Sequence, residues 1–355
     1  MSKEEYINTI SETLALEVRE PQIEIIYKKL EKHKKKEYNN FEFIDLFAGI
    51  GGLRIPFDEA GGKCVFSSEI DPYCQKTYYA NFGEIPNGDI TLINVDEIPK
   101  HDFLIGGFPC QAFSQAGNRL GFEDIRGTLF FNIASILQEH KPRAFLLENV
   151  KGLENHDHKR TFITIKSKLE EMGYKLFVKV LNSMTHANVP QNRERIFIVG
   201  ILEEYVKGEF TFPSEIKLTK TIHDLLDTDK KDDKYYYKKT HPYYSKLDES
   251  IISRDTIYQW RRVYVRANKK NVCPTLTANM GAGGHNVPII RDDFGIRKLT
   301  PRECARFQGY DDNFIFPNNI SDSKKYHQIG NSVTVPLIRR ISKKITEYLE
   351  FNNAD

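Results

Sequence analysis

The sequence predicts an α/β fold for residues 41–200, with a doubly wound and mainly parallel sheet, joined to a second and smaller domain. Short apolar runs typical of strands alternate with helical stretches such as 128–140 and 162–172. A glycine-rich turn follows the first run, and the alternation ends near residue 214. The six strand-like runs cover residues 43–47, 63–67, 103–105, 144–147, 176–181 and 196–199.

Length and composition indicate a soluble protein with one large domain or two. The chain has 355 residues, of which 40% are hydrophobic and 28% are charged. No run approaches the roughly 18 apolar residues of a membrane helix, and the Lys- and Glu-rich amino terminus lacks the apolar region of a signal peptide. We therefore expect a cytoplasmic protein with no membrane association.

The five cysteines are scattered along the chain and odd in number. Their spacing matches neither a disulfide framework nor a zinc site, so we expect no bound metal. They are Cys64, Cys74, Cys110, Cys273 and Cys304.

The positive charge is regional. The formal net charge is only +2, yet residues 230–270 hold 12 Lys or Arg against 5 Asp or Glu. Tyrosines and the single tryptophan, Trp260, are interleaved with these cations. Such a region is typical of a surface that contacts phosphates, although a solvated Lys-rich loop has the same composition.

We expect three parts along the chain. Residues 1–39 carry apolar positions at helical spacing and form an N-terminal helical extension. Residues 40–213 and 326–355 form the first domain, because the last segment ends in an amphipathic helix that needs a core to cover. The basic, aromatic and turn-rich residues 214–325 form the second domain, including a glycine-rich loop at 273–285 suited to close approach by a ligand.

The glycine-rich turn predicts a site for a cofactor that contains adenosine. Gly49, Gly51 and Gly52 follow the first strand, and Glu69 closes the second strand at the distance from which an acid can hold ribose hydroxyls. Asp89 and Ile90 form a short segment that can contact the base. The spacing is not the GxGxxG pattern of dinucleotide-binding proteins, and a glycine loop also serves as a plain tight turn.

Cys110 is the candidate nucleophile. It follows Gly-Phe-Pro at the carboxyl end of the strand 103–105, where open α/β sheets bind ligands. Pro109 fixes the backbone before the thiol, and glycines 106 and 107 permit close approach. The alternative is a small buried hydrophobic residue, which is the common role of a free cysteine.

Three further charged residues complete the candidate site. Glu148, in the triplet 148–150, ends the strand 144–147 in the same crevice and can act as an acid beside the nucleophile. Arg193 and Arg195 lie two residues apart in an extended segment, so both can hold one anionic partner. A structural carboxylate and a surface arginine pair are the alternatives.

Six stretches in this order resemble the DNA (cytosine-5) methyltransferases, and they span residues 43–337. The compact size resembles the bacterial restriction-modification type. The stretches are 45–52 (DLFAGIGG), 107–114 (GFPCQAFS), 148–150 (ENV), 191–195 (QNRER), 299–306 with 308–310 (LTPRECAR and QGY) and 328–333 (QIGNSV).

The resemblance implies a Rossmann-like fold dependent on S-adenosylmethionine, with S-adenosylhomocysteine as the product, and a target-recognition domain at 214–325. Cys110 would attack C6 of a cytosine flipped out of duplex DNA, and the cytosine would receive the methyl group at C5. Glu148 would act at N3, Arg195 would contact O2, and Arg193 would lie near the phosphate backbone and sugar.

The family pattern also implies cofactor and DNA contacts. The implied cofactor-binding residues are Phe47, Gly49, Gly52, Glu69, Ile70, Asp89, Ile90, Pro109, Leu129, Asn331, Ser332 and Val333. The implied DNA-binding residues are Gln111, Ser114, Thr275, Asn279, Gly283 and His285. The expected partners are double-stranded DNA and a cognate restriction endonuclease that acts on the same sites, and the enzyme is expected to work as a monomer.

Three other functions stay open from the residues alone. An oxidoreductase with a catalytic cysteine would share the glycine loop and the thiol, but not the 328–333 stretch or the basic domain. A tRNA cytosine methyltransferase uses the same chemistry, and the long basic region favours DNA. A DNA-binding module without activity is disfavoured because Cys110, Glu148 and Arg195 are all present. The sequence does not give the recognition site.

Overall fold

The computed structural model describes residues 40–108, 129–261, 263–282 and 286–351. By their contacts these residues group into two compact units. The α/β unit comprises the described residues up to 181 together with 194–214 and 338–351, and the hairpin unit comprises 182–193 and the described residues of 215–337. The N-terminal extension predicted for residues 1–39 lies outside the described residues.

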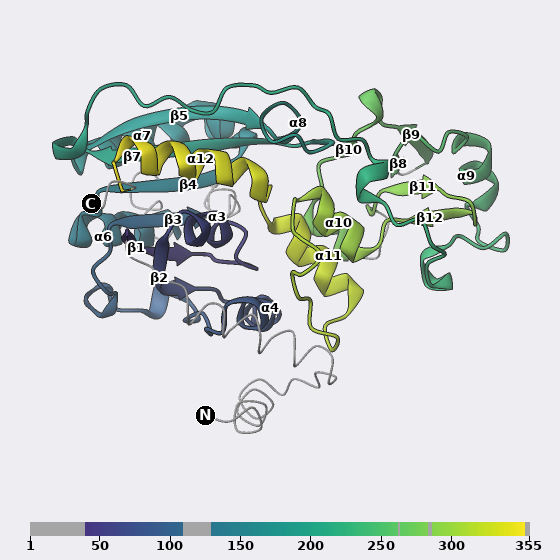
Figure 1. The fold of residues 1–355 in the computed structure, drawn as a ribbon, viewed down its shortest axis with the longest axis horizontal. Coiled ribbons are helices and arrows are strands. Elements are labelled where there is room, and N and C mark those ends of the chain that lie inside the picture. The colour runs from purple at the N-terminus through teal and green to yellow at the C-terminus, as the bar shows by residue number, and fades with distance from the viewer. Residues whose placement is uncertain (1–39, 109–128, 262, 283–285, 352–355) are drawn as a thin grey trace. The chain divides into compact units, whose positions relative to one another are not determined.

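A six-stranded sheet forms the α/β unit (Figure 1), with the strand order β2-β1-β3-β4-β7-β5. Strands β2, β1, β3 and β4 are parallel, whereas β7 runs antiparallel to β4. All six predicted strands are present, so the predicted doubly wound, mainly parallel sheet is confirmed. Their bounds are β1 Phe41–Leu46, β2 Gly62–Ser68, β3 Phe103–Gly107, β4 Ala144–Val150, β5 Tyr174–Asn182 and β7 Glu194–Leu202.

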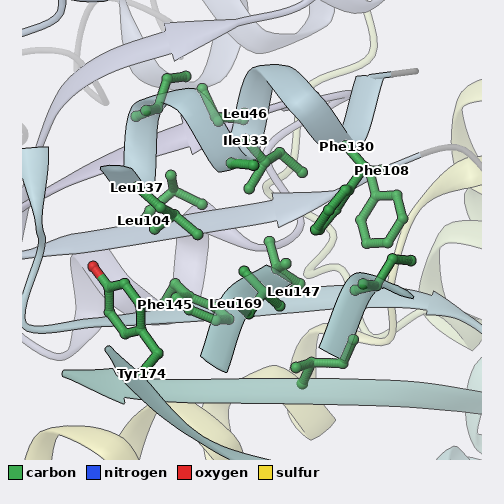
Figure 2. Close-up of a cluster of buried hydrophobic side chains, with 14 of the residues drawn as sticks. Leu46, Leu104, Phe108, Phe130, Ile133, Leu137, Phe145, Leu147, Leu169 and Tyr174 are labelled. Atoms are coloured by element: carbon green, nitrogen blue, oxygen red, sulfur yellow. The ribbon is translucent and has the colours of Figure 1, made fainter. Parts of the chain in front are cut away.

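Alternation along the strands assigns side chains to the two faces of the sheet. Leu104 of β3 packs in a cluster with the helices α6 (Leu129–His140) and α7 (Arg160–Glu171), as Figure 2 shows. The next residue back, Phe103, stacks instead with Phe57 of α3 (Arg54–Glu59), with ring centroids 5.4 Å apart. Helices therefore cover both faces of the sheet.

The C-terminal helix α12 (Val335–Tyr348) packs on the α/β unit from Ile338 onward. Its Arg339 forms an ion pair with Glu59 of α3 at 2.5 Å, and Ile338, Ile341 and Ile345 are fully buried. The predicted amphipathic helix thus has the core that it needs. Residues 326–337, expected with the first domain, group with the hairpin unit.

The hairpin unit contains a four-stranded sheet in the order β12-β11-β8-β9, and the pairs β12–β11, β11–β8 and β8–β9 are antiparallel. A two-stranded parallel ladder, β6 with β10, joins residues 191–192 to 273–274. The strands are β6 Gln191–Asn192, β8 Tyr258–Arg261, β9 Tyr264–Ala267, β10 Cys273–Pro274, β11 Ile289–Arg291 and β12 Ile296–Lys298.

The remaining helices are short. The α-helices are α4 Pro72–Phe82, α8 Ser183–His186, α9 Tyr244–Ser250, α10 Pro301–Phe307 and α11 Asp322–Asn331. The 3-10 turns are Ile90–Leu92, Val95–Glu97, Lys151–Lys159, Glu203–Tyr205, His223–Leu225, Asp233–Tyr235, Lys269–Asn271 and Ala278–Gly281. In the described part of the chain, no helix is long and apolar enough to cross a membrane.

Candidate functional site

The turn after β1 has a backbone that requires glycine. Gly49 and Gly51 have φ of +55° and +81°, in the left-handed region that only glycine adopts without strain. A Cβ on Gly51 would lie 2.2 Å from the ring of Phe82, so a side chain cannot be accommodated there. Phe47 also has a φ of +55°, and Gly52 is buried. The turn is therefore held in one conformation.

Glu69 supports this turn from the end of β2. One carboxylate oxygen accepts the backbone N–H of Gly49 at 2.7 Å, and the other accepts the N–H of Asp71 at 2.8 Å. Burial raises the pKa of Glu69, and the two N–H donors oppose that shift. Glu69 therefore lies next to the glycine turn through Gly49, and its contact with a ribose stays a prediction.

An apolar side chain lies exposed beside this acid. Ile70 is 68% exposed, an unusual environment for an isoleucine between a strand and a helix. Asp89 accepts hydrogen bonds from the backbone and hydroxyl of Thr91, and Ile90 is buried. Leu129 packs partly buried against the large cluster of the sheet. Pro109 lies outside the described residues.

A buried acid lies in β1 next to the turn. Asp45 is completely buried, and burial raises its pKa to about 8, although the Arg54 guanidinium opposes this shift. Arg54 itself pairs with Asp58 at 3.0 Å and Glu84 at 2.7 Å. Asp45 is therefore mainly a neutral carboxyl at neutral pH.

Glu148 and Arg195 form the central pair of the site. Arg195 Nε lies 3.0 Å from Glu148 Oε1, and the two side chains are only 13% and 10% exposed. In the β4–β7 ladder Glu148 is opposite Phe197 and Val150 is opposite Arg195, so the pair is diagonal on one face. A charge-assisted hydrogen bond of this kind orients the carboxylate.

The end of β3 is fixed next to this pair. Gly107 is in register with Glu148, and a Cβ on Gly107 would lie 3.5 Å from Glu148 Oε2. The buried amide of Asn149 donates to the carbonyl of Phe108 at 2.9 Å. The chain that leaves β3 toward Cys110 therefore starts beside Glu148. Cys110, Gln111 and Ser114 lie outside the described residues.

Arg193 has a different environment from Arg195. Its side chain is fully buried in the hairpin unit, where the guanidinium donates to the carbonyls of Leu276 at 2.6 Å and Ser332 at 2.5 Å. It also reaches the carbonyl of Gly330 at 3.4 Å. This burial does not match the predicted contact with the DNA backbone, because the cation is already used by carbonyl oxygens. The two arginines do not hold one common partner.

A polar network surrounds Arg193. The amide of Gln191 donates to the carbonyl of Phe307 at 2.6 Å and accepts from the backbone of Leu276 at 3.1 Å. Among the residues expected at the cofactor, Asn331 bonds to His327, Ser332 bonds to Tyr310, and Val333 is buried. These three residues belong to the hairpin unit and are fixed within it.

The hairpin unit also contains a pocket with a volume of about 580 Å³. Thr275 and Asn279, two of the predicted DNA-binding residues, line it, and Thr275 donates to the carbonyl of Asn192 at 2.7 Å. Gly283 and His285 lie outside the described residues. The lining also includes four cations of the basic region 230–270 and four amides for which no individual role was predicted. They are Arg261, Arg266, Lys269 and Lys270, and Asn192, Gln259, Asn268 and Asn286.

A sequence signal for some of these residues was present. Gln259-Trp260-Arg261 and Tyr264-Val265-Arg266 alternate polar with apolar side chains around a short turn, which is the pattern of a β-hairpin with one solvent face. The mixture of cations and aromatic residues in 230–270 predicted contacts with phosphates and not this hairpin. Asn149 and Asn192 lie in the stretches 148–150 and 191–195, but their contacts have no local signal. The amide of Asn149 donates to the carbonyl of Phe108, and the carbonyl of Asn192 accepts from Thr275, so both contacts join segments distant in sequence.

The fold is that of a methyltransferase. The structure matches Dnmt2 methyltransferase of S. pombe with a TM-score of 0.70 and 22% identity, over 88% of this chain and 99% of that one. It also matches a DNA modification methyltransferase described as putative, encoded within a prophage of E. coli, with a TM-score of 0.63 and 23% identity over 87% and 99% of the two chains.

The family follows from the sequence comparisons. A model of the C-5 cytosine-specific DNA methylases matches residues 41–347. Type II methyltransferase M.Bsp6I of Bacillus sp. (strain RFL6) is 48% identical over 86% of this chain and 98% of its own length. Type II methyltransferase M.HpaII of Haemophilus parainfluenzae is 45% identical over 87% and 90%. The chain belongs to the C-5 cytosine-specific DNA methylase family, and it is a DNA cytosine-5 methyltransferase.

Proposed function

We propose that this enzyme transfers a methyl group from S-adenosylmethionine to C5 of a cytosine flipped out of a specific DNA duplex, through a covalent bond between Cys110 and C6. The observation that carries the proposal is the Glu148–Arg195 pair, whose Glu148 is in register with Gly107 at the end of the strand that leads to Cys110. In this proposal Cys110 is the nucleophile that attacks the cytosine ring. The oriented Glu148 stabilises the negative charge that then develops on the ring.

The residues of the α/β unit fit the cofactor. The exposed Ile70 offers an apolar surface for adenine, and the carboxylate of Glu69 next to it can accept hydrogen bonds from ribose hydroxyls. Asp89 and the turn from Phe47 to Gly52 would complete the cradle. When bound, S-adenosylmethionine supplies an electrophilic methyl group and leaves as S-adenosylhomocysteine.

The chain's own residues carry the rest of the reaction. The thiolate of Cys110 adds to C6, which makes C5 electron-rich. Glu148 holds a hydrogen bond or proton at N3 and so stabilises the negative charge that develops on the ring. Arg195 keeps that carboxylate oriented and contacts O2. Once C5 carries the methyl group, its proton is lost to solvent, and the electron pair of the C5–H bond restores the aromatic ring and expels the thiolate of Cys110.

The hairpin unit is proposed to bind the duplex. The target cytosine must leave the base stack because C6 is buried in a duplex, at a cost of about a few kcal/mol. Basic residues such as Lys269 and Lys270 would hold phosphates, while Thr275 and Asn279 face the base edges. The names of the relatives, Type II methyltransferases, support a restriction-modification role with a cognate endonuclease. We further propose that the enzyme acts as a monomer.

The test incubates the protein with S-adenosylmethionine and unmethylated genomic DNA, digests the DNA to nucleosides and measures 5-methylcytosine by mass spectrometry. Cys110→Ala is assayed in parallel, together with its binding to duplex DNA. We expect 5-methylcytosine with the wild type and none with the variant, while the variant still binds DNA.

Each part of the proposal has its own contrary result. Turnover above a few per cent in Cys110→Ala would exclude the nucleophile. Methylation of RNA without methylation of DNA would change the substrate class. No product on either nucleic acid would contradict methyl transfer from this donor.

A further inference from the structure

The hairpin formed by β8 and β9 separates its side chains by face. Gln259 is directly opposite Arg266 in the antiparallel ladder, and Arg261 lies two residues after Gln259, so the three side chains share one face. The intervening residues Trp260 and Val265 pack on the other face, against a cluster that includes Tyr258. The three polar side chains line the pocket of the hairpin unit.

This face offers hydrogen-bond donors. The guanidinium of Arg261 donates to the side-chain oxygen of Gln259 at 3.2 Å, which orients that amide on the shared face, and the NH₂ group of Gln259 adds two donors. Arginine has donors only. Gln259, Arg261 and Arg266 therefore present a face on which hydrogen-bond donors outnumber acceptors.

Among the described residues, some arginines of the hairpin unit form ion pairs with carboxylates, and Arg266 does not. Arg254 pairs with Asp293, and Arg291 pairs with Asp248. Arg266 forms no ion pair with any carboxylate in the described part of the chain, and none of the described residues lining the pocket is acidic. The cation is thus available to an incoming ligand.

Base edges differ in what they offer such a surface. In the major groove guanine presents two adjacent acceptors, O6 and N7, whereas adenine presents one acceptor beside a donor and cytosine presents a donor. Arginine reads guanine by donating to both acceptors at once, and a cytosine reader needs a carboxylate. Arg266 has donors only and lies in a pocket whose described lining has no carboxylate, so this residue matches the two acceptors of guanine.

We propose that Arg266, supported by Gln259, is a specificity-determining residue that reads a guanine of the recognition sequence through O6 and N7 in the major groove. This inference rests on the proposed function, because it assumes that the hairpin unit binds the DNA that is methylated. The guanine that Arg266 reads belongs to a base pair other than the pair of the target cytosine.

The experiment uses the full-length enzyme and a library of DNA duplexes with random bases, in which methylated cytosines are located by bisulfite sequencing. Wild type, Arg266→Met and Gln259→Met are compared for their base preference at every position around the methylated cytosine. Arg254→Met is the matched control, since it removes an exposed arginine of the same unit that does not line the pocket. Melting temperatures confirm that each variant is folded.

We expect the wild type to require guanine at a position besides the partner of the target. Arg266→Met should lose about 10- to 100-fold of discrimination at that base pair and keep its preferences elsewhere. Gln259→Met should give a smaller loss at the same or the adjacent pair, and Arg254→Met should match the wild type.

Other patterns overturn the proposal. An even loss of methylation at all sites with unchanged base preferences would make Arg266 a phosphate contact. Loss of preference for a base other than guanine would overturn the assignment to O6 and N7. A wild type that methylates no duplex would instead contradict the proposed function, so the two failures are distinguishable.

Discussion

The two compact units are held together in different ways. In the α/β unit a continuous apolar cluster joins the sheet to α6 and α7, and aromatic rings fill the opposite face. In the hairpin unit the antiparallel sheet packs on a smaller cluster around Leu247 and Tyr258. Close apolar packing holds side chains in fixed positions. It also restricts which residues are tolerated, because a change of even one methylene group in the core affects packing and stability. The reaction needs such fixed geometry.

Polar and charged residues make up a larger share of the buried residues in the hairpin unit than in the α/β unit. Arg297 has a completely buried side chain and pairs with Glu303 at 2.8 Å and Asp292 at 2.5 Å, close to the start of α10. Thr300 and Glu303 form a capping box on the same helix. Such networks specify one arrangement because an unpaired member is costly. This leaves the outer surface available for base reading.

The largest effect that we predict concerns the α/β unit. Glu148→Gln should lower the rate of methyl transfer by about 100- to 10,000-fold, because an amide cannot supply the proton or the charge at N3. Steady-state rates and S-adenosylmethionine binding are measured together. Glu194→Gln is the matched control, since its exposed pair with Lys151 lies beside the buried pair. An equal loss of cofactor binding in Glu148→Gln would assign the carboxylate to the cofactor site instead.

The second prediction breaks the polar network of the hairpin unit. Arg297→Met removes one partner of a buried ion pair and leaves Glu303 fully buried, and Asp292 partly buried, without their cation, which costs about 3–5 kcal/mol. Chemical denaturation measures the free energy of unfolding. Arg254→Met, whose pair with Asp293 is exposed, should be close to the wild type. A small effect of Arg297→Met would mean that the unit depends on apolar packing after all.

The third prediction concerns Asp45. Its pKa in the folded protein is about 8, above the unfolded value near 3.8, so the unfolded chain releases a proton that the folded chain retains. Stability should therefore fall as pH rises from about 4 to about 8. Asp45→Asn removes this titration, so the melting temperature of the variant relative to the wild type should rise over that window. A constant difference would show that Asp45 is ionised in the fold.

The smallest effect concerns the basic rim of the pocket. Lys270→Met should weaken duplex binding evenly across sequences and reduce the salt dependence of log K by about 1. Titrations at several salt concentrations measure this slope. Lys246→Met, an exposed lysine of the same unit away from the pocket, is the control. An unchanged slope for Lys270→Met would exclude a phosphate contact at this residue.

Sequence patterns predicted the α/β unit better than the hairpin unit. The inner strands were identifiable because each is a short apolar run that is buried almost throughout, and Glu69 was identifiable from its distance to the glycines. The antiparallel orientation of β7 has no local signal, because strand direction depends on the connection. Arg193 and Arg195 look alike in sequence, yet one binds carbonyls and the other binds Glu148. Only long-range contacts separate the two roles.

The contacts of Arg193 have a consequence for how new specificities arise. Its acceptors are main-chain oxygens of Leu276, Gly330 and Ser332, and every amino acid has such an oxygen. The residues that read DNA can therefore mutate while this anchor persists. Because residues 182–193 group with the hairpin unit, an engineered exchange of specificity between relatives should transfer that segment as well, so that the anchor and its acceptors come from one parent.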